Sequence, residues 1–171
     1  MRLSVVVSSM VTTGDDAPRF EATIANGEVK AFELADALGG DPVVLAFFPG
    51  AFTPPCSNEM VALEAHADEF GDARVLGLSA DSAFALNAFR DEHDLSFDLL
   101  SDTSREAIEA YDLRIDIEEL GLFGVANRAV YVLDGDGTVS YTWTTEDPTV
   151  EPEYEELVEA VARAEGTENG V

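Results

Sequence analysis

Alternating hydrophobic and polar residues predict a hairpin, a buried strand and a helix in the N-terminal part of the chain. Residues 19–34 alternate on both sides of Asn26-Gly27, a pair that favours a two-residue hairpin turn. Residues 41–50 hold an almost wholly apolar run rich in Val and Phe, which is typical of a strand buried on both faces. From 55 to 70, apolar residues recur every three or four positions, which is the helical period.

The rest of the chain continues this alternation of strands and helices. In order, the pattern predicts a strand at 73–81, a helix carrying 84–90 and capped by Asp81 or Ser82, a strand at 96–102, a helix at 103–113, a hairpin at 127–145 and an amphipathic helix at 151–166. Strands that alternate with helices require parallel crossovers, whereas the late hairpin brings antiparallel neighbours. We therefore predict an α/β fold with a central mixed β-sheet, helices on both faces and an N-terminal hairpin.

The length and the apolar content indicate one folded domain. The 171 residues fall in the range of roughly 100 to 200 that one domain occupies. We predict a flexible N-terminal extension at 1–15, a single domain at 16–166 and a flexible C-terminal tail at 167–171. Met1 and Met10 are both possible starts of the protein. The chain has neither an apolar run long enough to cross a bilayer nor a secretory signal, so we expect a cytoplasmic protein.

The charge balance is extreme and limits the possible partners. The chain has 35 acidic residues against 9 Lys and Arg, of which only Lys30 is a lysine, and its formal net charge is −26. A surface this negative repels phosphate, so nucleic acid and anionic membranes are poor partners. Because the acidic residues are spread along the whole chain rather than gathered in one tail, the composition resembles that of halophilic proteins, whose self-repulsion is screened by molar salt, and we expect a halophilic, haloarchaeal source.

A single cysteine, Cys56, lies where the predicted buried strand gives way to a helix. One cysteine cannot form an intrachain disulfide, which fits a reducing compartment. At the start of a helix, the sulfur is expected to lie near unpaired N–H groups that carry partial positive charge and stabilise a thiolate. A buried structural cysteine is the alternative, but it would not require this position.

The residues around Cys56 form a recognisable motif. In "PGAFTPPC", Pro49, Thr53 and Cys56 follow the pattern Pro-x-x-x-Thr-x-x-Cys, which resembles the active-site signature of the peroxiredoxins, the AhpC/TSA superfamily. Residues 79–113 look like the strand, helix, strand and helix of that family, and 127–139 look like its arginine-bearing strand and hairpin. The resemblance covers nearly the whole chain and implies a thioredoxin-like fold, in agreement with the predicted architecture.

The resemblance implies a role for each site residue. Cys56 would be the nucleophile that attacks a hydroperoxide and becomes a sulfenic acid, with Thr53 accepting a hydrogen bond from the peroxide while its proton points to the thiolate. Arg128 would hold both the thiolate and the peroxide oxygens, and Pro49 would limit access of water. Thr53 could instead cap the helix, Arg128 could pair at the surface and Pro49 could simply end the strand. Glu59 could orient Arg128 or merely favour the helix dipole, so it stays outside the predicted site.

The absence of a second cysteine from the sequence affects the expected catalytic cycle. The chain resembles one-cysteine peroxiredoxins of the AhpE type, although "PGAFTP" is also similar to the peroxiredoxin-5 group. The expected partners are hydrogen peroxide or alkyl hydroperoxides and an external reductant, either a small thiol or a thioredoxin- or glutaredoxin-like protein, with no cofactor or metal. A homodimer or larger homo-oligomer is typical of the family. The alternative function is a peroxide sensor or redox-regulated binding protein without efficient turnover.

The charge balance generates a test in salt. We expect the unfolding temperature to rise as KCl increases from about 0.1 M towards 3 M, because screening weakens repulsion among the acidic side chains. Thermal unfolding followed by circular dichroism across this range measures the effect. A flat or falling curve would contradict the halophilic interpretation.

Overall fold

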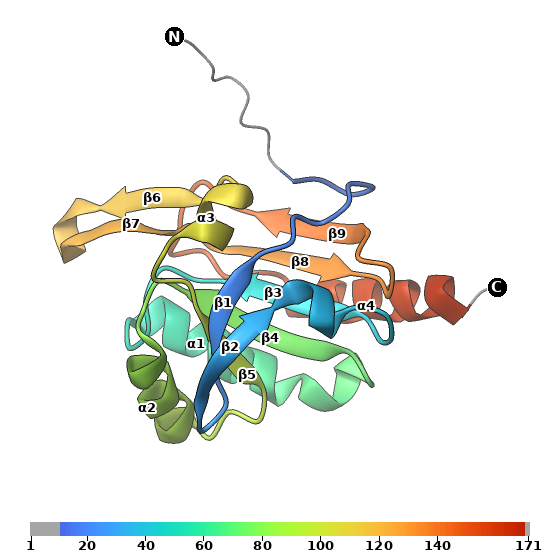
Figure 1. The fold of residues 1–171 in the computed structure, drawn as a ribbon, viewed down its shortest axis with the longest axis horizontal. Helices are drawn as coiled ribbons and strands as arrows, with labels where there is room; N and C mark the ends of the chain where they lie inside the picture. The colour runs from blue at the N-terminus through green and yellow to red at the C-terminus, as the bar shows by residue number, and fades with distance from the viewer. Residues whose placement is uncertain (1–10, 170–171) are drawn as a thin grey trace, which may run out of the picture.

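A seven-stranded mixed sheet forms the centre of the computed structural model, which describes residues 11–169 (Figure 1). The strand order is β2-β1-β5-β4-β3-β8-β9, and a separate pair, β6-β7, stands apart from this sheet. The strands are β1 (Glu21–Ala25), β2 (Val29–Glu33), β3 (Val43–Phe47), β4 (Arg74–Ser79), β5 (Asp98–Ser101), β6 (Arg114–Ile117), β7 (Leu122–Ala126), β8 (Ala129–Leu133) and β9 (Val139–Thr144).

Within residues 11–169, four α-helices and three short 3-10 helices connect and cover the strands. They are α1 (Pro54–Ala65), α2 (Ala83–His93), α3 (Glu106–Ala110), α4 (Tyr154–Asn169), η2 (Leu34–Ala37), η3 (Ala67–Phe70) and η4 (Glu118–Leu120). Among the described residues, no helix combines the length and the apolar character needed to cross a membrane.

The pairing of β3 explains why the sheet is mixed. This strand runs parallel to β4 and antiparallel to β8, and all five of its side chains are buried, as the apolar run at 41–50 predicts. β4 and β5 are also parallel, whereas the β1-β2 and β8-β9 hairpins are antiparallel. The predicted mixed sheet and N-terminal hairpin are therefore confirmed.

The helices lie on both faces of the sheet, as predicted. Val44 and Ala46 of β3 point to the face covered by α1, α2 and α4, and form one hydrophobic cluster with them. Leu45 and Phe47 point to the opposite face, where α3 and residues from the N-terminal segment complete a second cluster. Figure 1 shows α3 on the side of the sheet opposite to α1 and α2. The alternation of β3 side chains thus divides the core into two layers.

The ends of the folded region differ from the predicted boundaries. Val11 is buried in the core, and the backbone of 14–15 pairs with Val139 through two hydrogen bonds of 2.8 Å. Residues 11–15 therefore belong to the folded domain and not to an extension that ends at 15. At the other end, α4 continues to Asn169, beyond the predicted boundary at 166. The remaining parts of the predicted extension and tail, 1–10 and 170–171, lie outside the described residues. Met1 and Met10, the two possible starts, are among them.

The β6-β7 pair is absent from the predicted elements. We call this pair, with the η4 turn between its strands, the β6-β7 arm; it extends away from the central sheet in Figure 1. The chain reverses through a 3-10 turn followed by Gly121 at φ 69°. Because this turn contains no Asn-Gly or Asp-Gly pair, the sequence carries no hairpin signal here. The predicted helix at 55–70 also breaks, at His66, into α1 and η3.

Candidate active site

Cys56 lies in the first turn of α1, directly after the loop that leaves β3. Thr53 occupies the position before the helix, and Pro54 and Pro55 are its first two residues. Proline suits these positions because its fixed φ matches the helix and its missing N–H would have no partner within the helix. Cys56 follows as the third helical residue, with 1% of its surface exposed. The two prolines therefore begin the helix and set the thiol beneath the loop.

The same prolines weaken one part of the expected electrostatics. The sequence predicts that several unpaired N–H groups of the helix N-terminus surround the sulfur, but Pro54 and Pro55 carry none. The first turn thus offers the thiol fewer donors than an ordinary helix start. A positive charge from elsewhere in the chain becomes correspondingly more important for a thiolate at Cys56.

Arg128 supplies that charge. It directly precedes β8, and because Phe47 at the end of β3 pairs with Ala129 at the start of β8, the arginine reaches the beginning of α1. Its Nη2 donates to Sγ of Cys56 at 3.2 Å, its Nη1 donates to Glu59, and its Nε donates to the carbonyl of Pro148 at 2.8 Å. Arg128 is 1% exposed, so it is not the surface ion pair that was the alternative.

Glu59 is the counter-ion of Arg128 and belongs to the site. It is fully buried one helical turn after Cys56, on the same side of α1. Burial raises the pKa of Glu59 to about 7, and the neighbouring Arg128 opposes this rise. Burial alone would lower the pKa of Arg128, but Glu59 and Cys56 together raise it, so the guanidinium keeps its charge. The spacing of three residues from Cys56 was the available sequence signal. It fitted either a partner of Arg128 or an exposed residue that favours the helix dipole, and the burial of Glu59 favours the first.

Thr53 belongs to the same site, but its hydroxyl proton does not point to the thiolate, contrary to the prediction from the sequence. Its hydroxyl donates to the carbonyl of Gly50 at 2.9 Å, so the single proton is not directed at the thiolate. The oxygen lone pairs remain able to accept a hydrogen bond. The side chain makes no capping hydrogen bond to α1, which removes the helix-cap alternative for this residue.

The loop that carries Thr53 is strained and is held by Asp81, which the sequence suggested only as a helix cap; Ser82 is the cap of α2. Phe52 has φ 70°, in the left-handed region that a bulky side chain rarely adopts. The Asp81 carboxylate accepts from the N–H of Ala51 at 2.8 Å and from the hydroxyl of Ser79 at 2.6 Å. Because Asp81 follows β4, a neighbour of β3 in the sheet, the core itself fixes the loop; no spacing in the sequence indicates this contact.

A small pocket of about 80 Å³ opens above the sulfur. Pro49 lies in its wall, so the predicted residues Pro49, Thr53, Cys56 and Arg128 all meet at one cavity. The other lining residues are Pro55, Ile117, Leu120, Leu122, Pro148 and Thr149. Three of these come from the β6-β7 arm, so part of the wall was absent from the predicted site.

Comparison with known proteins identifies the family. A model of the AhpC/TSA family matches residues 13–142, a range that includes Pro49, Thr53, Cys56, Glu59 and Arg128. The chain belongs to the AhpC/TSA family. Its fold is the mixed α/β, thioredoxin-like fold of the peroxiredoxins, as predicted.

Relatives in sequence and structure carry peroxiredoxin names. Chloroplastic peroxiredoxin Q of Oryza sativa subsp. japonica is 31% identical over 144 residues, which cover 82% of this chain and 63% of the rice protein. A putative peroxiredoxin bcp of Coxiella burnetii is 30% identical over 136 residues, covering 78% of this chain and 88% of that protein. The crystal structure of peroxidoxin BcpB from Mycobacterium tuberculosis matches with a TM-score of 0.77 and 25% identity, over 90% of this chain and 97% of that one.

The buried carboxyl of Glu59 predicts a pH-dependent contribution to stability. Because its pKa is about 7 in the folded chain and about 4.5 ordinarily, the folded chain retains a proton between these values that the unfolded chain has lost. The stabilisation that comes from this retained proton is complete below pH 4.5, and it is lost as the pH rises through about 7. We expect the free energy of unfolding of the wild type, relative to Glu59→Gln, to fall by on the order of 1–3 kcal/mol between pH 4.5 and 8.

Urea denaturation at several pH values and constant KCl measures this difference. Glu155→Gln, on the exposed side of α4, is the matched control and should follow the wild type at every pH. Parallel curves for the wild type and Glu59→Gln would contradict a raised pKa at Glu59.

Proposed function

We propose that this protein is a thiol-dependent peroxidase that reduces hydroperoxides at Cys56. The observation that carries the proposal is the buried contact of 3.2 Å between Arg128 and the sulfur at the base of the pocket, in a chain of the AhpC/TSA family. The thiolate attacks the terminal oxygen of ROOH, an S–O bond forms and the O–O bond breaks. Cys56 becomes a sulfenic acid, and RO⁻ takes up a proton and leaves as an alcohol or as water.

The pocket geometry supports a role for each neighbour in this displacement. Arg128 keeps its positive charge beside the sulfur, so it can follow the negative charge as it moves from the sulfur to the leaving oxygen. Thr53 can accept a hydrogen bond from the proton of the peroxide, because its own proton is donated to Gly50. Pro49 lines the wall of the pocket, a position from which it would shield the sulfenic acid and slow its further oxidation.

We infer a one-cysteine catalytic cycle for the chain. Cys56 is the sole cysteine of the sequence, so no second cysteine of the same chain can resolve the sulfenic acid. One external thiol would condense with the sulfenic acid to a mixed disulfide and release water, and a second would release Cys56 as a thiol and leave as a disulfide. A small thiol or a thioredoxin- or glutaredoxin-like protein meets this requirement, and an AhpE-like subtype fits it.

The burial of Cys56 favours a second candidate, a peroxide sensor. With 1% of the residue exposed, a peroxide can enter through the pocket, whereas a bulky thiol has little access to the sulfur. Slow reduction would preserve the oxidised state long enough to be read by a binding partner. The first chemical step is the same in both functions, and the rate of recycling separates them.

Three exposed aromatic side chains support self-association. Phe52, Phe84 and Phe123 are exposed in a surface otherwise rich in acidic residues, and Phe52 packs on Phe89 of α2 with ring centroids 5.2 Å apart. A homodimer or larger homo-oligomer would cover such groups. The single cysteine and the high negative charge also support a reducing, cytoplasmic location in a salt-rich cell, without nucleic acid or membrane partners.

The first test of the proposed function is the fate of Cys56 after peroxide treatment. We expect one equivalent of hydrogen peroxide to convert Cys56 to a sulfenic acid, detected by intact mass spectrometry as an adduct with a 1,3-dione trap. In molar KCl with a thiol donor, the wild type should consume peroxide repeatedly, and Cys56→Ser should not. A single turnover without recycling would favour the sensor, and repeated turnover by Cys56→Ser would exclude both functions.

The second test compares two substitutions of Thr53 that are similar in size. Thr53→Val removes the hydroxyl, so we expect the rate constant of Cys56 oxidation to fall by on the order of 10²-fold, as for loss of a transition-state hydrogen bond. Thr53→Ser retains the hydroxyl and should lose much less. Stopped-flow oxidation with hydrogen peroxide measures both rate constants, and equal values for the two variants would exclude a hydroxyl role.

A further inference from the structure

Two acidic side chains and one cation are buried together at the start of α1. Glu59 is 0% exposed, and Cys56 and Arg128 are each 1% exposed. Nη1 of Arg128 donates to Oε1 of Glu59, and Nη2 donates to Sγ of Cys56 at 3.2 Å. The two groups that can become negative therefore depend on the same positive charge.

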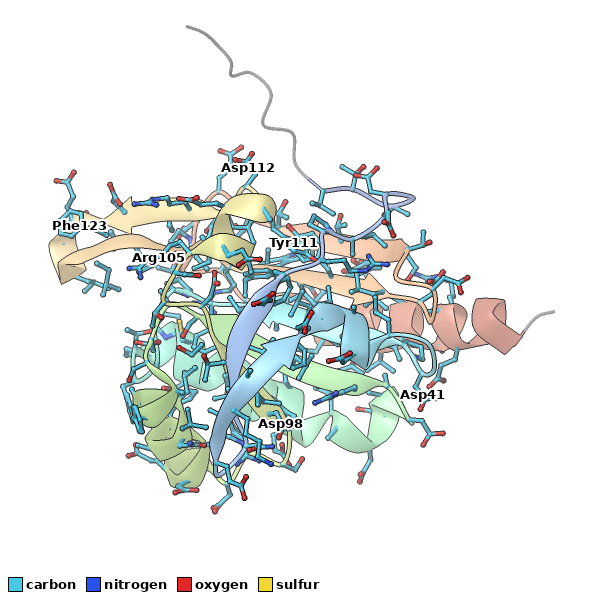
Figure 2. All side chains as sticks on the ribbon, in the orientation of Figure 1. Asp41, Asp98, Arg105, Tyr111, Asp112 and Phe123 are labelled. Carbon is cyan, nitrogen blue, oxygen red and sulfur yellow. The ribbon has the colours of Figure 1, made fainter. Side chains whose placement is uncertain are left out.

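The carboxyl of Glu59 has a hydrogen bond on one oxygen only. Figure 2 shows Asp41 and Asp112 at the outside of the molecule, where water solvates their carboxylates. In contrast, Oε2 of Glu59 is buried and has no hydrogen-bond partner among the described residues. A buried oxygen without a partner disfavours the charged form. A protonated carboxyl avoids much of this cost, and it can still accept from Arg128 through Oε1.

The groups that face Glu59 from the neighbouring elements also favour the protonated carboxyl. From the segment before α4, the negative charge of Glu151 raises the pKa of Glu59. Tyr154 of α4 lies close enough to interact with Glu59, and its hydroxyl donates to Glu151 at 2.6 Å. His66, further along α1, stacks on Tyr154. Within residues 11–169, Arg128 is the one cation that pairs with Glu59.

One buried guanidinium can balance one buried anion but not two. If Glu59 and Cys56 were both ionised, the site would hold an uncompensated negative charge out of water, in a chain whose formal net charge is already −26. If both were protonated, the guanidinium itself would be uncompensated. Between these extremes, the favoured state holds one negative charge and one proton.

We propose that Glu59 and Cys56 share one proton beside Arg128, so that Glu59 limits the fraction of Cys56 present as a thiolate. In one form the carboxyl holds the proton and the sulfur is a thiolate. In the other form the carboxylate pairs with Arg128 and the sulfur is a thiol. Because both forms contain the same number of protons, the ratio between them does not change with pH.

The shared proton gives Glu59 a regulatory role in peroxide reduction. This consequence rests on the peroxidase function proposed above, because the thiolate and not the thiol is the nucleophile. A carboxyl is ordinarily a stronger acid than a thiol, so the carboxylate takes at least an equal share of the negative charge. Part of Cys56 is thus held as an unreactive thiol while Glu59 is ionised.

Glu59→Gln separates this role from simple positioning of Arg128. The amide keeps an oxygen that accepts from Nη1, as the protonated carboxyl does, but it cannot become negative. The sulfur is then the only acid bonded to the guanidinium, so we expect the thiolate fraction near pH 7 to rise about twofold or more over the wild type. If Glu59 only positioned Arg128, the substitution would lower the thiolate fraction or leave it unchanged.

The first measurement is the ultraviolet absorbance of the thiolate as a function of pH in molar KCl. Cys56 is the sole cysteine of the sequence, so the signal has one source, and subtracting the matching Cys56→Ser chain removes the contribution of the tyrosines. The wild type should titrate in two steps separated by a plateau, and Glu59→Gln in one step. Glu155→Gln, on the exposed side of α4, is the control and should follow the wild type.

The second measurement is the rate constant of Cys56 oxidation by hydrogen peroxide, with the sulfenic acid trapped by the 1,3-dione. Near pH 7, Glu59→Gln should react faster than the wild type by the same factor as its thiolate fraction. The two rate constants should approach each other at alkaline pH, where both chains hold Cys56 fully as a thiolate.

The outcomes separate the inference from the function beneath it. The inference is wrong if the thiolate titrations of the wild type and Glu59→Gln superimpose, or if the variant holds less thiolate near pH 7. A single step in the wild type would also overturn it, whether or not Glu59→Gln folds. If Cys56 forms a thiolate but hydrogen peroxide produces no sulfenic acid, the proposed function is wrong and the shared proton stands.

Discussion

The buried guanidinium of Arg128 is the constraint on which the rest of the site depends. A charge taken out of water must be paired and hydrogen-bonded, or it destabilises the fold strongly. Arg128 meets this requirement with the Glu59 carboxylate, the Cys56 sulfur and the Pro148 carbonyl. These three partners come from two separate parts of the chain, so the same contacts that make the charge tolerable also join α1 to the segment before α4. The Cys56 thiol is thus part of the interactions that stabilise the centre of the molecule.

The order of the strands explains how these partners meet. β3 and β8 are antiparallel neighbours in the middle of the sheet, so the end of β3, where the loop to α1 begins, lies beside the residue that precedes β8. β4 is the other neighbour of β3, and Asp81 after it holds the loop from the opposite side. The strained backbone at Phe52 is supported from rigid elements on both sides, which is the usual condition for strain at a functional site.

The distribution of charge separates the site from the rest of the surface. The acidic residues that give the chain its charge of −26 are spread along the whole sequence. Two of its few arginines serve the pocket in different ways: Arg128 brings positive charge to the sulfur, and Arg105 pairs with backbone carbonyls of the β6-β7 arm. Ile117, Leu120 and Leu122 of the arm line the pocket, which thus combines one fixed charge with apolar side chains.

The sequence by itself determined the alternation of strands and helices and the mixed sheet, because hydrophobic periodicity is a local signal. The motif around the cysteine and the family resemblance predicted Pro49, Thr53, Cys56 and Arg128 as site residues, and these four residues line one pocket. Only the tertiary structure decided the role of Glu59, because a carboxylate one turn after Cys56 is ordinary when exposed and exceptional when buried. Asp81 and the β6-β7 arm were missed for a related reason. Asp81 contacts Ala51, which is 30 positions away, and this contact forms only once the sheet has brought the two segments together. The β6-β7 arm depends on a turn without a distinctive residue pair, so its pairing left no local signal in the sequence.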